Sequence, residues 1–305
     1  MELPEHIQKL YRHFSFHTAK KNKAGLCILK DRTLERHLTW FIQERIAIWK
    51  KKTSGTTPPF TKDEVLAQYR FCNIFREFDR QTIEFHERLN PLRDDFPLWL
   101  LNMFYFRMVA RTETVQTVGL LSFDMEENKK LYERLMKSSR PRYGTPYVFP
   151  VSVIQKSKTP TRELFITEHL PKVMKAVAQE IQSWERVSVY EGVERLLPLF
   201  KYNLRFLWTE VLIDTAYQFP QHLDLFGRFP IGPGSLPTMK RIDAQKDPAI
   251  LVCELAQVPI ATGLTYKKKP LRLSAENWEG IGREYRKYTN LRAGKGRRRI
   301  FHSGR

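Results

Sequence analysis

DRTLERHLTWFIQERIAIWKKK, residues 31–52, sets the fold class, because its apolar side chains recur with the period of an α-helix. The apolar positions are Leu34, Leu38, Phe41, Ile42, Ile46, Ile48 and Trp49. This spacing places them on one broad face of an amphipathic helix. The pattern therefore predicts a helix from Asp31 to about Lys52.

The same periodicity predicts helices over most of the remaining chain. The pattern Thr61-x-x-Glu64 predicts a capping box for a helix that we expect to end at Leu89, before Pro91. Further helices are expected over 98–110, 112–123, 161–184, 201–217 and 274–290. A polar helix is expected to follow residue 123 and to end at Met136, and another helix is expected to begin at Ser188. The sequence thus predicts a mainly α fold, a compact helical domain with little β structure.

Two segments do not follow this pattern. Residues 138–160 hold four prolines and are expected to form a hinge or loop, and residues 218–272 are expected to be irregular. Only VFPVSVI, residues 148–154, and ILVCELAQV, residues 250–258, could form strands. No internal repeat is visible.

The charge balance points to a polyanionic partner. The chain has 52 Lys+Arg against 33 Asp+Glu, a net charge of +19, with 42% hydrophobic residues. Residues 263–305 alone carry 13 Lys+Arg and three Asp+Glu, a net charge of +10. We expect an amino-terminal helical appendage (1–60), a helical catalytic core (61–262) and a basic carboxy-terminal segment that contacts DNA (263–305), packed as one unit. A generically basic protein is the alternative.

Several protein classes are excluded. The most apolar run, residues 96–106, is far shorter than a bilayer span and contains Pro97 and Asn102, and the amino terminus lacks the apolar stretch of a signal peptide. We therefore expect a cytoplasmic protein without a membrane partner. The three scattered cysteines form no CxxC pair, and His13 and His17 have no third ligand nearby, so we expect surface histidines and no metal site.

Nucleotide-binding and hydrolase motifs are also missing. The 305 residues contain no GxxxxGK(S/T), no GxGxxG after a strand, no HExxH and no GxSxG. A P-loop kinase, a Rossmann dehydrogenase and a zinc protease are therefore disfavoured.

An arginine-rich stripe is expected on the predicted helix 62–89. Within RFCNIFREFDRQ, residues 70–81, the narrow arc opposite the aromatic face holds Arg70, Asn73, Arg76, Glu77 and Arg80. Several arginines with an asparagine on one stripe suit recognition of phosphate or carboxylate. The alternative is a solvated face stabilised by local ion pairs, in which Asp79 pairs with Arg76.

Two carboxylates are expected to share one face of the predicted helix 201–217. Glu210 and Asp214 have i,i+4 spacing among apolar residues, and burial would raise a carboxyl pKa and make a general base. An exposed helix edge is the alternative. The turn Gly232-Pro233-Gly234 could present backbone N–H groups to a phosphate, although most such triplets are ordinary turns.

The carboxy-terminal segment interleaves tyrosines with cations. Tyr285 and Tyr288 alternate with Lys287, Lys295 and Arg297, a composition that suits base stacking and phosphate contact. A solvated basic tail is the alternative.

These motifs, in their order, carry a family resemblance. R-x-x-N-x-x-R-x-x-D-R falls on 70–80, and F-R-x-x-x-R-x-E-T on 106–114, with its arginines at Arg107 and Arg111. YGTPY (143–147), E-V-x-x-D (210–214), GPG (232–234) and E-Y-x-K-Y with G-x-G-R (284–297) follow. Over residues 62–300 the chain resembles the α-glutamyl/putrescinyl thymine pyrophosphorylases, or amino acid:DNA transferases. That family is related to the helical domain of 5-hydroxymethyluracil DNA kinases and distantly to helix-hairpin-helix DNA glycosylases.

The resemblance implies bacteriophage DNA hypermodification. A 5-hydroxymethyluracil DNA kinase would act first on double-stranded phage DNA in the host cytoplasm. The transferase would then displace the phosphoryl group with an amino acid or other amine. No cofactor is evident, although Mg²⁺ could enter with the phosphate. A glycosylase-like base-excising enzyme and a non-catalytic DNA-binding partner of the kinase are the alternatives.

Roles for the residues follow from this chemistry. The expected general base is Asp214 or Asp79, and Arg76 and Glu210 complete the catalytic set. Phosphate and base binding is expected from Arg70, Asn73, Arg80, Arg107, Arg111, Gly232 and Gly234. DNA contact is expected from Tyr285, Lys287, Tyr288, Lys295 and Arg297. The target base would be reached by extruding its nucleotide from the stack.

Overall fold

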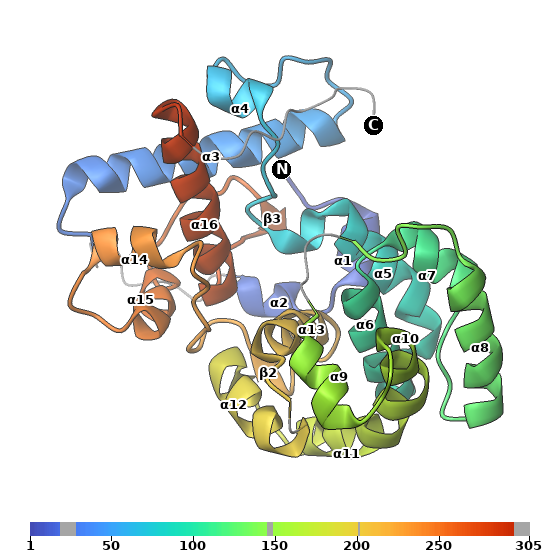
Figure 1. Cartoon of the computed structure of the whole chain (residues 1–305). Helices are drawn as coiled ribbons and strands as arrows, with labels where there is room; N and C mark the ends of the chain where they lie inside the picture. The colour runs from blue at the N-terminus through green and yellow to red at the C-terminus, as the bar shows by residue number, and fades with distance from the viewer. Residues whose placement is uncertain (19–28, 145–148, 201, 296–305) are drawn as a thin grey trace. The chain divides into compact units, whose positions relative to one another are not determined.

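The structure, a computed structural model, describes residues 1–18, 29–144, 149–200 and 202–295 (Figure 1). It is mainly helical with four two-residue strands in the described ranges, which confirms the expected fold class. The elements group into two compact units. Unit 1 comprises 1–9, 14–79 and the chain from Leu225 onward, and unit 2 comprises 10–13 and 80–224.

Unit 1 is built around the long helices α3 and α16. Residues distant in sequence meet here, because α16 packs on α3, α4, α14 and α15. Asp31 caps α3 by accepting the N–H groups of Thr33 and Leu34, and the expected apolar face is buried. The elements are α1 (Glu5–Leu10, ending in unit 2), α2 (Phe14–His17), α3 (Arg32–Thr53), α4 (Glu64–Gln68), the 3₁₀ turn η1 (Arg76–Phe78), α14 (Leu236–Ile242), α15 (Pro248–Leu255), β3 (Thr265–Tyr266), β4 (Lys269–Pro270) and α16 (Ala275–Arg292).

Unit 2 has α6 and α13 at its centre, since almost every residue of these two helices is buried. Helix α6 packs on α11 and α13, and α12 packs on α13. The elements are α5 (Arg80–Leu89), η2 (Asn90–Leu92), α6 (Phe96–Val109), α7 (Thr112–Val118), α8 (Met125–Lys137), α9 (Val151–Ser157), α10 (Arg162–Leu164), the π-helical turn η3 (Phe165–His169), α11 (Leu170–Gln182), β1 (Val187–Ser188), α12 (Val189–Phe200), α13 (Arg205–Gln218) and β2 (Leu223–Asp224).

The helix expected over 62–89 is interrupted, and this corrects the arginine-stripe prediction. Helix α4 ends at Gln68 and α5 begins only at Arg80. In the segment between these helices, two backbone carbonyls accept hydrogen bonds from Arg45 of α3, and the backbone N–H of Asn73 donates to the Asp79 carboxylate. These bonds replace the helical ladder. Arg70, Asn73, Arg76 and Arg80 therefore do not share one helical face.

Both strand predictions are wrong where the structure describes the segments. Residues from Val151 form α9, and most of 250–258 belongs to α15, so the irregular region 218–272 contains two helices. Helix α15 is started by Asp247, which accepts the Ala249 N–H, and by Pro248 in the first turn. A short apolar run is compatible with either a strand or a buried helix, so periodicity could not separate them.

The histidines expected at the surface are buried, each 1% exposed. The His13 ring lies 4.5 Å from that of Tyr217 within unit 2, and burial lowers the His13 pKa to about 3. In unit 1, His17 Nδ1 lies 3.2 Å from the Arg272 carbonyl. Their neighbours in the sequence, Tyr11 and Phe14, are also buried. Among the described residues, no helix is long and apolar enough to cross a bilayer.

Candidate functional site

The arginine loop, residues 69–79 of unit 1, brings several of the expected site residues together. Asn73 donates to Asp79 Oδ1 from both its backbone N, at 3.2 Å, and its Nδ2, at 2.8 Å. The charge of Arg76 also acts on Asp79. The loop thus holds one carboxylate in a fixed position beside an arginine.

Asp79 has the protonation behaviour of an acid–base group. Burial raises its pKa from 3.8 to about 6, and the negative charge of Glu284 acts in the same direction. The bonds from Asn73 and the charge of Arg76 oppose that rise without cancelling it. A carboxyl group with a pKa near 6 is ionised at neutral pH and can act as a general base there, because its pKa lies close to the pH.

Charged side chains of α3 and α16 hold the loop through hydrogen bonds to its backbone. Arg45, which is 5% exposed, donates from Nη2 to the carbonyls of Phe71, at 3.2 Å, and Cys72, at 2.9 Å. Glu284 accepts the Cys72 N–H at 3.2 Å. Lys287, expected to contact DNA, donates its ammonium to the Arg70 carbonyl. The loop conformation is therefore built by side chains from two other helices.

Arg70 projects from this supported loop. Its side chain is exposed, and within the described ranges its guanidinium makes no ion pair. A fixed loop with an exposed arginine, together with the Arg76 charge at Asp79, is chemically suited to an anionic group.

A second cluster, the Asp214 cluster, lies inside unit 2. Asp214 is fully buried, and its two oxygens accept from Arg107 Nε at 2.5 Å and Nη2 at 2.7 Å. Arg107 Nη2 also reaches Thr82 Oγ1 at 3.3 Å, so α5, α6 and α13 are tied together at one point. A paired charge at this depth is structurally demanding, because losing one partner leaves the other uncompensated.

His86 extends the Asp214 cluster into a chain of hydrogen bonds. Its Nε2 lies 3.0 Å from Asp214 Oδ1, and its Nδ1 lies 3.0 Å from Gln218 Nε2. Because the Gln218 amide nitrogen can only donate, Nδ1 is the acceptor, and Nε2 carries the proton and donates to Asp214. Gln218 Nε2 also donates to the Leu10 carbonyl at 2.6 Å, and Arg93 donates to Gln218 Oε1.

The remaining predicted residues of unit 2 lie on the surface or at its edge. Glu210 is half-buried on α13, one turn before Asp214. Exposed Arg80 pairs with Glu84 at 2.6 Å. Arg111 precedes α7, donates to a loop carbonyl and pairs with Glu113 at 3.3 Å.

The glycine turn 232–234 packs closely on α16. The Gly232 N–H points to Glu279 Oε1 at 3.4 Å, and a Cβ at Gly234 would lie 3.0 Å from Arg283 Cγ. The Gly232 amide expected to face a phosphate therefore faces a carboxylate. Close packing between turn and helix accounts for glycine at position 234.

The α16 tyrosines are packed side chains. Tyr285 and Tyr288 are 4% and 3% exposed, and both rings contact Phe41 of α3. Tyr288 also donates its hydroxyl to Asp63 Oδ2 at 2.8 Å. Lys295 is exposed. Arg297 lies outside the described residues, as do positions 145–147 of the YGTPY motif.

Sequence reasoning missed the supporting residues Arg45, His86 and Gln218, and also Trp40. Arg45 gave a signal, since it interrupts the apolar face of residues 31–52 between Phe41 and Trp49. Trp40 also gave a signal, because it is an aromatic residue that lies outside that apolar face. His86 and Gln218 gave none, because their partners are far away in sequence.

Comparisons with known proteins identify relatives of this chain. The family described as the helical domain of 5-hmdU DNA kinase matches residues 33–261. A protein of Bacillus phage SP10 named 5-hmdU DNA kinase is 30% identical over 114 residues, which cover 34% of this chain and 18% of that relative. The match thus spans less than a fifth of the relative's length. No solved structure matches, and the distant likeness to helix-hairpin-helix glycosylases stays a prediction.

Proposed function

Because this chain belongs to the family of 5-hmdU DNA kinase helical domains, we propose that it acts in bacteriophage DNA base hypermodification. The proposed reaction transfers an amino acid or another amine onto phosphorylated 5-hydroxymethyluracil in DNA. Transfer is favoured over phosphorylation because the 305 residues contain no P-loop motif. A kinase acting upstream would supply the phosphorylated base.

The reaction exchanges one bond at the exocyclic methylene carbon. The amine nitrogen forms a bond to this carbon, and the bond from carbon to the phosphoryl oxygen breaks. The phosphate leaves with the bonding electrons, and the amine gives up a proton to a base. Two protein functions are needed: cations for the leaving phosphate and a group that accepts the proton.

The arginine loop is the observation that carries this proposal. Asp79, with its pKa near 6, is the proposed proton acceptor, and Arg76 and Arg70 are the proposed cations for the phosphate. Asp214 is the alternative base, but its oxygens already accept three bonds, two from Arg107 and one from His86. The geometry therefore supports Asp79 as the base and Asp214 as a positioning residue.

Other expected residues keep supporting roles in the proposal. Arg80 and Arg111 offer guanidinium groups for the DNA backbone, Glu210 of α13 stays a proposed catalytic carboxylate, and Asn73 orients the Asp79 carboxylate. Mg²⁺ could accompany the phosphate.

The test is incubation of the full chain with DNA containing phosphorylated 5-hydroxymethyluracil and a panel of amines, followed by digestion and mass analysis of nucleosides. A new aminated nucleoside supports the proposal. Abasic sites would instead indicate a glycosylase, and unchanged DNA would leave a non-catalytic binding partner of the kinase.

Single-residue variants locate the site in the same assay. Arg76→Ala and Asp214→Asn are each expected to abolish turnover, the latter through loss of the cluster. If both retain the wild-type rate, the assignment of residues is wrong.

A further inference from the structure

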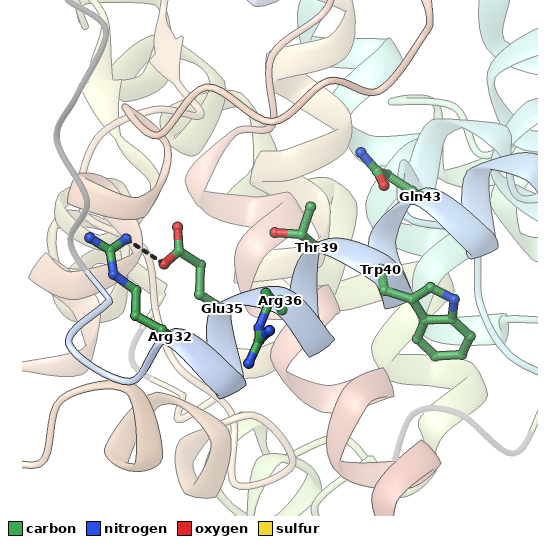
Figure 2. A pocket seen from close by; sticks show the side chains of 6 residues that line it. All are labelled: Arg32, Glu35, Arg36, Thr39, Trp40 and Gln43. Atoms are coloured by element: carbon green, nitrogen blue, oxygen red, sulfur yellow. Dashed lines mark hydrogen bonds and ion pairs between the residues drawn. The ribbon is translucent and has the colours of Figure 1, made fainter.

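The outer face of α3 carries an exposed aromatic and cationic surface that the proposed reaction does not use. Arg32, Arg36 and Trp40 project from successive turns of the helix, four residues apart (Figure 2). Trp40 is 40% exposed, whereas each of the other five tryptophans is at most 8% exposed. The core therefore does not account for this tryptophan.

Trp40 borders two depressions of unit 1. Along α3, a depression of about 680 Å³ is lined by Arg32, Glu35, Arg36, Thr39, Trp40 and Gln43 (Figure 2). Towards α14 and α16, Trp40 lines a smaller pocket of about 330 Å³ with Arg241, Tyr288 and Arg292. The Tyr288 ring centroid lies 5.8 Å from that of Trp40. An occupant of the pocket would meet the exposed Trp40 side chain and two arginines, Arg241 and Arg292.

The charges around Trp40 favour an anion. Arg36 and Arg241 are exposed, and among the described residues neither makes an ion pair at contact distance; the charge of Arg241 acts on the Asp31 carboxylate. The nearby carboxylates are already engaged: Glu35 pairs with Arg32 at 2.8 Å, and Asp31 accepts two backbone N–H groups at the start of α3. Cationic side chains are therefore left in excess around an exposed aromatic ring.

We propose that the Trp40 surface, formed by Arg32, Arg36, Trp40, Arg241 and Arg292, binds an unpaired stretch of DNA. One base stacks on the Trp40 indole, and the arginines contact the flanking phosphates. Aromatic residues among cations bind single strands this way, because every base offers a π-face. The 330 Å³ pocket is at the small end for ligand sites, which fits one nucleotide. The inference takes from the proposed function only that DNA is the polyanion.

Titration of the full chain with a single-stranded oligothymidylate tests this binding site. Because Trp40 is the exposed tryptophan, stacking should quench part of the intrinsic fluorescence, and Trp40→Phe should lose most of that response. Trp40→Ala should weaken binding by roughly five- to a hundredfold. Phe206→Ala, which removes a 54% exposed aromatic of unit 2, is the matched control and should bind normally.

The salt dependence tests the cations separately. Arg36→Gln should weaken binding and reduce the slope of log affinity against log salt by about one, whereas exposed Lys130→Gln on α8 should not. Wild-type affinity in Trp40→Ala, or the absence of quenching in the wild type, would overturn the proposal. These measurements need no turnover. A chain that binds through Trp40 without aminating DNA would refute the proposed reaction alone, and an active chain whose binding ignores Trp40 would refute this site alone.

Discussion

Asp79→Asn is expected to make the protein more stable while abolishing its activity. Burial raises the Asp79 pKa from 3.8 to about 6 in the folded protein. Each pKa unit corresponds to about 1.4 kcal/mol, so an ionised Asp79 costs up to about 3 kcal/mol of folding free energy. Solvent reaching this half-buried side chain lowers the expected gain to between about 1 and 3 kcal/mol. Asparagine keeps the oxygen that accepts from Asn73.

The stability difference between Asp79→Asn and the wild type is expected to grow with pH. Because the folded protein holds the Asp79 proton more tightly than the unfolded chain, this residue favours folding below pH 3.8. That contribution is lost as the pH rises through about 6. The stability advantage of Asp79→Asn should therefore be near zero at about pH 4 and complete above about pH 7.

Urea unfolding of both proteins across this pH range measures the difference, since other titrating groups cancel between them. Asp94→Asn, at an exposed carboxylate of unit 2, is the matched control for the loss of one negative charge. A stability difference between Asp79→Asn and wild type that does not change from pH 4 to pH 7.5, or a variant less stable than wild type at pH 7.5, would refute the reasoning. Full transfer activity in Asp79→Asn would refute the assignment of the base.

Wild-type kcat/KM should fall about tenfold per pH unit below about pH 6 as Asp79 becomes protonated, and a flat profile down to pH 5 would contradict it. Asp214→Ala should lower the free energy of unfolding by about 3–5 kcal/mol, because it strands buried Arg107; urea titration checks this, and Arg107→Met in the same chain should recover part of the loss. Gly282→Ala should destabilise by about 1–3 kcal/mol, because its Cβ would lie 2.2 Å from a serine hydroxyl. In thermal unfolding, Gly280→Ala on the same helix has open space and should stabilise by about 0.5–1 kcal/mol.

Helices with one continuous buried face were predictable from the sequence. Residues 31–52 and 274–290 appear as α3 and α16 with nearly the expected bounds, because one-sided burial imposes the helical period on the sequence. The segment 62–89 had equally regular spacing. Its central part is nevertheless irregular, because Arg45 and Glu284 bind its backbone from 26 and 212 residues away. No local pattern contains such contacts.

The sequence named several residues of the candidate site, but it could not show the environment of each one. Asp79 and Asp214 were both candidate bases, and spacing alone could not rank them. The structure distinguishes them through Asn73 and Glu284 at one carboxylate and through Arg107 at the other. The tyrosines of α16 could not be recognised as buried, because their partner Phe41 lies on a distant helix.

Transfer of a labelled nitrogen tests the central claim most directly. The full chain is incubated with a ¹⁵N-labelled amine and DNA carrying phosphorylated 5-hydroxymethyluracil, and the released phosphate and the digested nucleosides are both quantified. The proposed reaction predicts one ¹⁵N atom bonded to the exocyclic methylene for each phosphate released, and loss of both signals in Asp79→Asn. Phosphate release without ¹⁵N in the nucleoside, or no phosphate release with any amine of the panel, would contradict it.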